Sequence, residues 1–250
     1  MTKEEAASAP HPGLHPLGMD GFLARFGTEF SLEANRAAQA FAREASALEG
    51  VEEVLPALAS TLVRFDSTGD AAAGRRGALQ DRLTDLLQSR DWLALPAEAA
   101  ARRWTLPVSF DGEDAPGLAE AAAEAGLSEA DAVAQILDAA PRVLAIGFAP
   151  GQPYIGLLPE AWDFPRRTEL RDVPAGALVA AIRQLVLFAN ASPTGWLQIG
   201  RTAFAPFQPG AEQPMPLRQG DEIRLARISR QERQSLSGTP MGGARLEVLR

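Results

Sequence analysis

The second half of the chain loses its helix signals after Gly156 and becomes a series of short apolar runs separated by proline and glycine. These runs are "DVPAGALVAAI" (172–182), "QLVLFA" (184–189), "GWLQIGRTAF" (195–204) and "DEIRLARI" (221–228). Several short strands set closely between turn residues are typical of a closed or nearly closed antiparallel architecture. The sequence therefore predicts a compact β-barrel or sandwich for this half.

The first half has a different order of signals. Two short strands around a turn are predicted within 14–27, a helix over 31–49 with Ser31 as its N-cap and Gly50 as its stop, and a hairpin over 51–66. A second amphipathic helix follows, with its apolar stripe at Leu79, Leu83, Leu86 and Leu87. A split βαβ unit has the order strand, helix, two strands and helix. This half is therefore predicted to be a ferredoxin-like α/β module.

We divide the chain into four parts from these patterns. Residues 1–13 are small, polar and proline-bearing and are predicted to be a disordered leader, followed by the α/β module over 14–103. The β-barrel domain spans 104–228 and begins with a strand and two short helices before its first buried strand, "RVLAIGF". Residues 229–250 are predicted to be a polar tail that ends in one more strand, "ARLEVLR". The predicted class is α+β.

Composition excludes several classes of function. The chain has no cysteine, so disulfides, thiolate metal sites and a cysteine nucleophile are ruled out. Its net charge of −8, without a run of basic residues, argues against a nucleic-acid partner. No segment approaches the length of a membrane span and the start lacks the pattern of a signal peptide, so no membrane association and a cytoplasmic location are predicted.

The stretch "GFAPGQPYIG" (147–156) is the most unusual local feature. Proline fixes φ and removes a backbone donor, whereas glycine permits positive φ and close approach of another chain or ligand. Gly147, Gly151 and Gly156 surround Gln152 and Tyr154, the only tyrosine of the chain. We predict that this loop is a rigid wall of a binding pocket.

Further candidate residues follow this loop along the chain. Planar guanidinium groups suit carboxylates and phosphates, and the amide of Gln184 beside "LVLFA" must be exposed or hydrogen-bonded. The predicted substrate-binding residues are Arg166, Arg167, Arg171, Gln184, Tyr154, Gln152, Ser192, Trp196, Arg201 and Thr202, with Gly147, Gly151, Gly156 and Gly195 shaping the loop backbone. The alternative for the three loop arginines, that they are merely solvated, stays open.

No complete catalytic set accompanies these residues. Ser192 has no histidine nearby to act as a base, and His11 and His15 lie in or beside the leader without a helix to aim both at one ion. Phosphate-binding loop, zinc and nucleophile-elbow motifs are absent from the sequence. The catalytic residue stays unassigned, and no metal is expected in this chain.

Four ordered motifs, "GFAPGQPYIGLLPE", "FPRRTELRDVPAGALV", "ASPTGWLQIGRT" and "PLRQGDEIRLARI", resemble the family of the 5-oxoprolinase B subunit. That family is also described as allophanate hydrolase subunit 1 and includes the sporulation kinase inhibitor KipI. The similarity covers most of residues 14–228. It implies a small α/β module followed by a cyclophilin-like β-barrel domain.

The resemblance also implies a partner and a reaction. Members form a hetero-oligomer with a protein of the 5-oxoprolinase C-subunit type, and the complex opens 5-oxoproline to glutamate with ATP, so no cofactor is expected to bind this chain itself. A small amide or lactam acid is the implied substrate. Two alternatives stay open: half of an allophanate hydrolase or urea carboxylase type of carboxyltransferase, which biotin would visit, and a non-catalytic kinase inhibitor like KipI.

This chain departs from the family pattern before the "SPTGW" motif. Gln184 is retained, but the usual glycine, threonine, tyrosine and proline residues around it are replaced by Ile182, Leu185, Val186, Phe188 and Ala189, and a later glycine by Thr194. The phenylalanine usual in the opening loop is Gln152. These changes remove polar handles and close the backbone, which is consistent with a different ligand or with assembly kept without chemistry.

The last residues allow two interpretations. "ARLEVLR" is similar to the way relatives of the C-subunit type begin, which would make the chain the front part of a fusion between the B-type and C-type proteins. A plain terminal strand fits the same residues equally well.

Overall fold

The structure is a computed structural model that describes residues 12–249, so His11 and nearly all of the predicted leader lie outside the described residues. The chain forms two compact units, the first ending at Glu98 and the second beginning at Ala99. The predicted domain boundary at residue 104 falls inside the first strand of the second unit. Across the described residues, no helix has both the length and the apolar character that crossing a bilayer requires.

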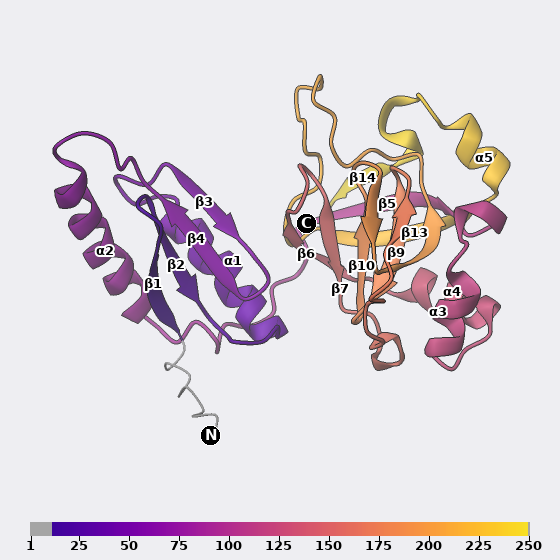
Figure 1. Cartoon of the computed structure of the whole chain (residues 1–250), viewed down its shortest axis with the longest axis horizontal. Coiled ribbons are helices and arrows are strands. Elements are labelled where there is room, and N and C mark those ends of the chain that lie inside the picture. The colour runs from indigo at the N-terminus through magenta and orange to yellow at the C-terminus, as the bar shows by residue number, and fades with distance from the viewer. Residues whose placement is uncertain (1–11, 250) are drawn as a thin grey trace. The chain divides into compact units, whose positions relative to one another are not determined.

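The first unit is an antiparallel sheet with two helices (Figure 1). Its elements are β1 (Gly13–Leu17), β2 (Gly21–Arg25), α1 (Leu32–Ala45), β3 (Glu53–Pro56), β4 (Ser60–Arg64) and α2 (Ala72–Gln88), and its sheet order is β1-β2-β4-β3. A split βαβ unit closes its sheet with a strand after the second helix. Here β1, which precedes the first helix, takes an edge of the sheet, so the ferredoxin-like assignment stays a prediction.

Both helices pack on one face of this sheet. Ser31 caps α1 as predicted, accepting a hydrogen bond from the Ala34 amide at 3.0 Å. The leucine stripe of α2 meets alternate residues of β2 and an aromatic group in which Phe41 and Trp92 lie edge to face with ring centroids 5.4 Å apart. The core of the first unit is therefore complete without the second.

The second unit contains most of the strands. Its elements are β5 (Arg102–Ser109), η1 (Gly112–Asp114), α3 (Leu118–Glu124), α4 (Glu129–Asp138), β6 (Arg142–Ile146), β7 (Pro153–Gly156), η2 (Glu160–Trp162), β8 (Arg171–Val173), β9 (Ala177–Ala181), β10 (Gln184–Leu187), β11 (Ser192–Thr194), β12 (Leu197–Arg201), β13 (Glu222–Ile228), α5 (Arg230–Ser235), η3 (Pro240–Gly243) and β14 (Arg245–Val248).

Seven of these strands close into a barrel. The order is β12-β9-β10-β7-β6-β13-β5, and β12 returns to β5 through the pair Arg201 and Ser109. β13 runs parallel to β5 over seven paired residues, from Glu222 with Arg103 to Ile228 with Ser109. This closed barrel is consistent with the predicted cyclophilin-like domain, and closure leaves its seven strands without a free edge.

Strands β9 and β10 are buried on both faces. Leu178, Ala180, Leu185 and Leu187 join the large core that α3 and α4 also line. The alternate residues Ala177, Val179, Val186 and Phe188 form a second apolar cluster with Val173 of β8. Because successive side chains of a strand point to opposite faces, this second cluster lies on the other side of the same sheet.

The segment after residue 228 is regular structure rather than a polar tail. Ser229 and Glu232 form a capping box that starts α5, with the Ser229 side chain accepting from the Glu232 amide and the Glu232 carboxylate accepting from the Ser229 amide. β14 then pairs with β5 of the same sheet. The S-x-x-E spacing of the capping box was available in the sequence and would have predicted this helix.

The hairpin between β9 and β10 turns through Ile182 and Arg183, whose φ angles are 44° and 59°. A two-residue turn with both residues at positive φ favours asparagine and glycine, whereas a β-branched residue there is strained. The turn is held from outside, because the Ile182 amide donates to Phe164 O and the Arg183 amide to Trp162 O. Tertiary hydrogen bonds thus impose a conformation that the residue type disfavours.

We expect Ile182→Asn to stabilise the second unit by about 1 kcal/mol, because asparagine adopts this backbone at lower cost. The measurement is the free energy of unfolding from denaturant titration. Ile182→Val is the matched control, since it keeps the branched Cβ and should give no gain. An asparagine variant that unfolds at the same or a lower denaturant concentration than the parent would contradict the strain.

Candidate functional site

Tyr154 and Gln184 lie on the face of the barrel sheet that carries the second apolar cluster. Across β10 and β7, Gln184 pairs with Gly156 and Val186 pairs with Tyr154. Directly paired residues of antiparallel strands point to the same face, and so do residues two apart along one strand. Gly156 contributes no side chain, and the Leu144 side chain occupies the adjoining space, since its Cδ1 atom would lie 2.9 Å from a Cβ added at Gly156.

Tyr154 is held by an aromatic neighbour and an amide. Its ring lies edge to face with Trp196, with centroids 6.4 Å apart and an interplanar angle of 72°. The Gln152 side chain hydrogen-bonds its hydroxyl and also accepts from the Ala189 amide at 3.4 Å. Gln152 is buried, so its side chain links Tyr154 to the Ala189 backbone within the packed part of the unit.

The electrostatic surroundings of Tyr154 favour its neutral form. Burial raises the pKa of the phenol above its usual value, and the hydrogen bond from Gln152 and the positive charge of Arg166 oppose that rise. Arg166 is exposed and makes no ion pair within residues 12–249. One cation without a carboxylate partner therefore lies near the tyrosine hydroxyl.

Gln184 is only 3% exposed, yet its amide makes no hydrogen bond within the described residues. The oxygen and the nitrogen of this amide each keep some contact with accessible space. They do so although Gly156 packs closely on the Gln184 stem, with an added Cβ 3.3 Å from Gln184 Cγ. A buried glutamine with a free amide can both donate to and accept from a small polar ligand.

The loop before β7 is a self-contained turn. The Gly147 amide donates to Gln152 O at 3.0 Å, and the Gln152 amide donates to Ala149 O at 3.1 Å. Gly151, at φ 72°, lies so close to Pro206 that a Cβ would be 2.3 Å from its carbonyl oxygen. These contacts hold Phe148 at φ 70° with 78% of its surface exposed. The predicted rigid wall is thus a rigid turn that presents an aromatic side chain outward.

Two of the three predicted loop arginines are already paired within the chain. Arg167 contacts Glu120 at 2.9 Å and Glu124 at 2.6 Å, and Arg171 contacts Glu120 at 3.2 Å. These glutamates lie on α3, so the two guanidinium groups tie the 166–171 segment to that helix. For both residues the geometry supports a positioning role rather than direct capture of a substrate carboxylate.

The ribbon of β8 and β11 lies over the second apolar cluster. Ser192 pairs with Val173, and the Thr194 hydroxyl accepts from the Trp196 amide at 3.1 Å. Gly195 is needed for its close approach to the next segment, because an added Cβ would lie 2.1 Å from Arg167 O. Ser192 is half-buried, and its hydroxyl has no hydrogen-bond partner in the described part of the chain.

Arg201 and Thr202 belong to a different place. Trp196 directly precedes β12 and Arg201 is its last residue, so roughly 16 Å of extended chain separates them. Thr202 is buried and uses its hydroxyl to accept from the Phe204 amide at 3.1 Å. The predicted single surface is therefore divided: Gln152, Tyr154, Arg166, Gln184 and Trp196 come together, whereas Arg201 and Thr202 do not join them.

Within residues 12–249, no group of three or more acidic, histidine or cysteine residues is arranged to hold a metal ion. His15 lies in β1 of the first unit, where its Nε2 atom is buried without a hydrogen-bond partner. The site as described can bind and orient a small polar molecule through an amide, a phenol and a guanidinium. It presents no paired nucleophile and base.

Comparison with known proteins gives a family match over most of the chain. Residues 12–217 match the family described as carboxyltransferase domain, subdomain C and D. The B subunit of 5-oxoprolinase from Escherichia coli O157:H7 is 35% identical over 183 residues, which are 67% of this chain and 82% of that protein.

Solved structures agree on the fold. The crystal structure of TTHA0988 is 33% identical, with a TM-score of 0.66, and the match covers 84% of this chain and 40% of that one. This chain therefore corresponds to less than half of that longer protein. The urea carboxylase of Kluyveromyces lactis, at 17% identity and a TM-score of 0.67 over 94% of this chain and 23% of that one, shares the fold.

Because Tyr154 is the only tyrosine, the phenolate absorbance of the chain reports on it alone. We expect this absorbance to titrate at higher pH in the folded chain than in the denatured chain, because burial disfavours the charged form. The unfolded state then loses its proton first, so stability should fall as the pH rises above about 10. Equal midpoints in native buffer and in denaturant would show that the phenol is not buried.

We expect Gly195→Ala to destabilise the second unit by about 1–3 kcal/mol, because its new methyl group would overlap the Arg167 carbonyl oxygen. Thermal and denaturant unfolding measure this loss. Gly210→Ala is the control, since Gly210 is exposed with no atom within 4 Å of an added Cβ and should change stability by less than about 0.5 kcal/mol. Similar losses in both variants would refute the close packing.

Proposed function

Because the chain belongs to the family of the carboxyltransferase domain, subdomain C and D, we propose that it is a B-type component of a 5-oxoprolinase complex. The relatives named as the B subunit of 5-oxoprolinase support this function, and the word subunit implies a partner. We propose a protein of the C-subunit type as that partner, either separate or fused. The complex would open the lactam of 5-oxoproline to glutamate in the cytoplasm.

The observation that carries this proposal is the buried Gln184 with a free amide beside Gly156. A lactam presents one N–H and one C=O at neighbouring atoms, and a primary amide can pair with both. The hydroxyl of Tyr154 lies on the same face and adds a second polar contact. Arg166, the unpaired arginine of the trio, would hold the substrate carboxylate in place of the predicted Arg167 and Arg171.

This chain would bind and orient the substrate while its partner proteins supply the chemical step. The absence of a paired nucleophile and base in the described site is consistent with that division. We place the use of ATP on a partner protein, because the glycine-rich turn at 147–152 spends the Gly147 and Gln152 amides on its own carbonyls and does not form a phosphate cradle.

A second candidate function is half of a carboxyltransferase acting on urea or allophanate. The family description favours it, since carboxyltransferase domains are what the matching model describes. Biotin would then carry the carboxyl group to the same face of the barrel. The same amide pairing serves urea, so the substrate assay rather than the geometry separates the two.

The test is co-expression with a partner of the C-subunit type and the third protein of the complex, followed by an assay of glutamate release from 5-oxoproline with ATP. We expect Gln184→Leu to lower kcat/KM at least about tenfold, because one lost hydrogen bond to a substrate removes roughly 1–3 kcal/mol. Gln213→Leu, the same change at an exposed glutamine, is the control and should leave turnover unchanged.

The contrary outcomes are distinct. Full activity in the Gln184→Leu complex would remove the site assignment while leaving the complex intact. Carboxylation of urea without release of glutamate would favour the carboxyltransferase. A chain that purifies without the C-type partner and binds a histidine kinase would point to a regulator of the KipI kind.

A further inference from the structure

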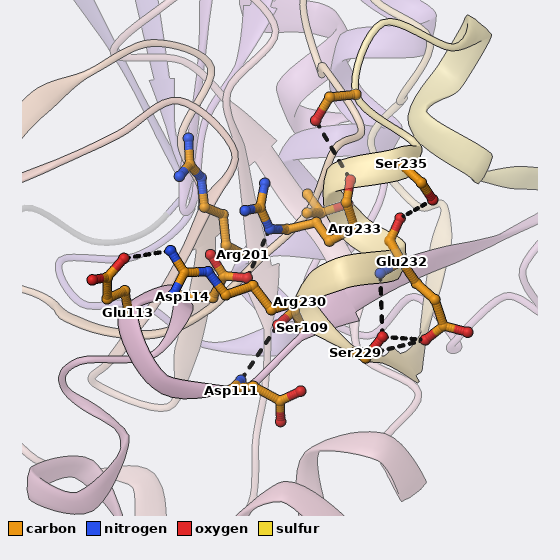
Figure 2. A network of polar contacts seen from close by, with 12 residues as sticks. Ser109, Asp111, Glu113, Asp114, Arg201, Ser229, Arg230, Glu232, Arg233 and Ser235 are labelled. Atoms are coloured by element: carbon orange, nitrogen blue, oxygen red, sulfur yellow. Dashed lines mark hydrogen bonds and ion pairs between the residues drawn. The ribbon is translucent and has the colours of Figure 1, made fainter.

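Three arginines gather around one buried carboxylate at the end of β12. Figure 2 shows Arg201 of β12 and Arg230 and Arg233 of α5 around Asp114 of η1. Asp114 is 1% exposed and Arg233 is 7% exposed. This cluster includes one residue of the predicted substrate site, Arg201, but lies at the opposite end of β12 from Trp196.

The carboxylates of the cluster do not balance its arginines. Arg233 donates through Nε to Asp114 Oδ2 at 2.7 Å, and Arg230 pairs with Glu113. Arg201 makes no ion pair within the described residues and donates only through Nε to Ala175 O at 3.3 Å. Two carboxylates face three guanidinium groups, so one positive charge is uncompensated.

The terminal nitrogens of Arg201 and Arg233 have no protein acceptor among the described residues. Arg233 uses only Nε on Asp114, and neither of its Nη atoms has a protein acceptor in the described part of the chain. Both Nη atoms keep contact with accessible space, although the Arg233 side chain as a whole is buried. The Nη atoms of Arg201 likewise have no acceptor in residues 12–249.

The arginines lie close enough to affect one another. Burial lowers the pKa of Arg201, and the positive charge of Arg233 lowers it further. Asp114 raises this pKa by a smaller amount, and Arg230 lowers it by less again. Arg230 adds to this cost, since its Nε is buried without a hydrogen-bond partner. Holding guanidinium groups together in a partly buried position is unfavourable unless an anion joins them.

We propose that Arg201 and Arg233 form a binding site for a small oxyanion, a carboxylate or a phosphate group, held between their free Nη atoms. The planar donor fork of arginine matches two oxygens of such a group. Asp114 fixes the Arg233 side chain from the other side and so sets the position of the fork. This site is separate from the face of Tyr154 and Gln184 and does not depend on the proposed function.

The structure around the cluster is rigid. Gln198 of β12 donates to Asp114 O at 2.9 Å and its own carbonyl accepts from the Gly117 amide at 2.8 Å. The capping box of α5 fixes the first turn that carries Arg230 and Arg233. A preorganised pair of donors needs little ordering when an anion binds, which favours affinity.

The test is calorimetric titration of the whole chain with inorganic phosphate and with malonate at low ionic strength, with sodium chloride at matched ionic strength as the reference. We expect phosphate or malonate to bind and chloride not to, because a spherical ion cannot engage the fork. Arg201→Gln should weaken binding at least about tenfold. The control is Arg227→Gln, the same charge change at an exposed arginine that pairs with Asp111 at 3.2 Å.

A second variant guards against loss of folding. Arg201→Lys keeps the charge but not the fork, so we expect its affinity for the anion to fall several-fold while its circular dichroism stays unchanged. If Arg201→Gln does not fold, the affinity of Arg201→Lys decides the test. If phosphate binds more tightly than malonate, the ligand is assigned as a phosphoryl group, and if malonate binds more tightly, it is assigned as a carboxylate. Either outcome supports the site. No binding of either anion by the parent at about 10 mM, or equal weakening in the Arg201 and Arg227 variants, would overturn it.

Discussion

The second unit depends on the burial of strands β9 and β10 on both faces. One face of these strands lines the large core with α3 and α4, and the other carries a second apolar cluster with Val186 and Phe188. A sheet with two apolar faces must be covered twice, because apolar surface left in water costs roughly 25 cal/mol per Å². The ribbon of β8 and β11 and the rings of Tyr154 and Trp196 supply the second cover.

The candidate site follows from that second cover. A polar residue on a doubly buried strand must find a partner or reach accessible space, and the amide of Gln184 has no partner among the described residues. The same cover brings Tyr154 and Trp196 together and places Gln152 behind the phenol. The polar groups of the site are thus held by a scaffold of packed apolar side chains, as ligand sites commonly are.

The arginines of this unit have three separate roles. Arg167 and Arg171 hold a loop to the glutamates of α3, and Arg233 holds α5 to the buried Asp114. Arg166 and Arg201 have no carboxylate partner among the described residues. Arg201 is partly buried, where an unpaired cation is costly, so an external anion gives a physical reason for its position, whereas Arg166 is exposed.

The sequence by itself determined the elements whose signals are local: the capped helix at Ser31, the leucine stripe of α2, the short strands between prolines and glycines, and a shaped turn at 147–156. The spacing of Ser229 and Glu232 also indicates α5, but this helix contains no apolar residue and so shows no apolar periodicity. Only the tertiary structure decided which arginines are paired, that Gln152 accepts from the Ala189 amide, and that Arg201 lies with Arg230 and Arg233 (Figure 2) instead of with Trp196. These contacts join residues that lie about 30 to 120 positions apart and are brought together by barrel closure. Local propensity carries no information on which distant residue becomes the partner of a given charge.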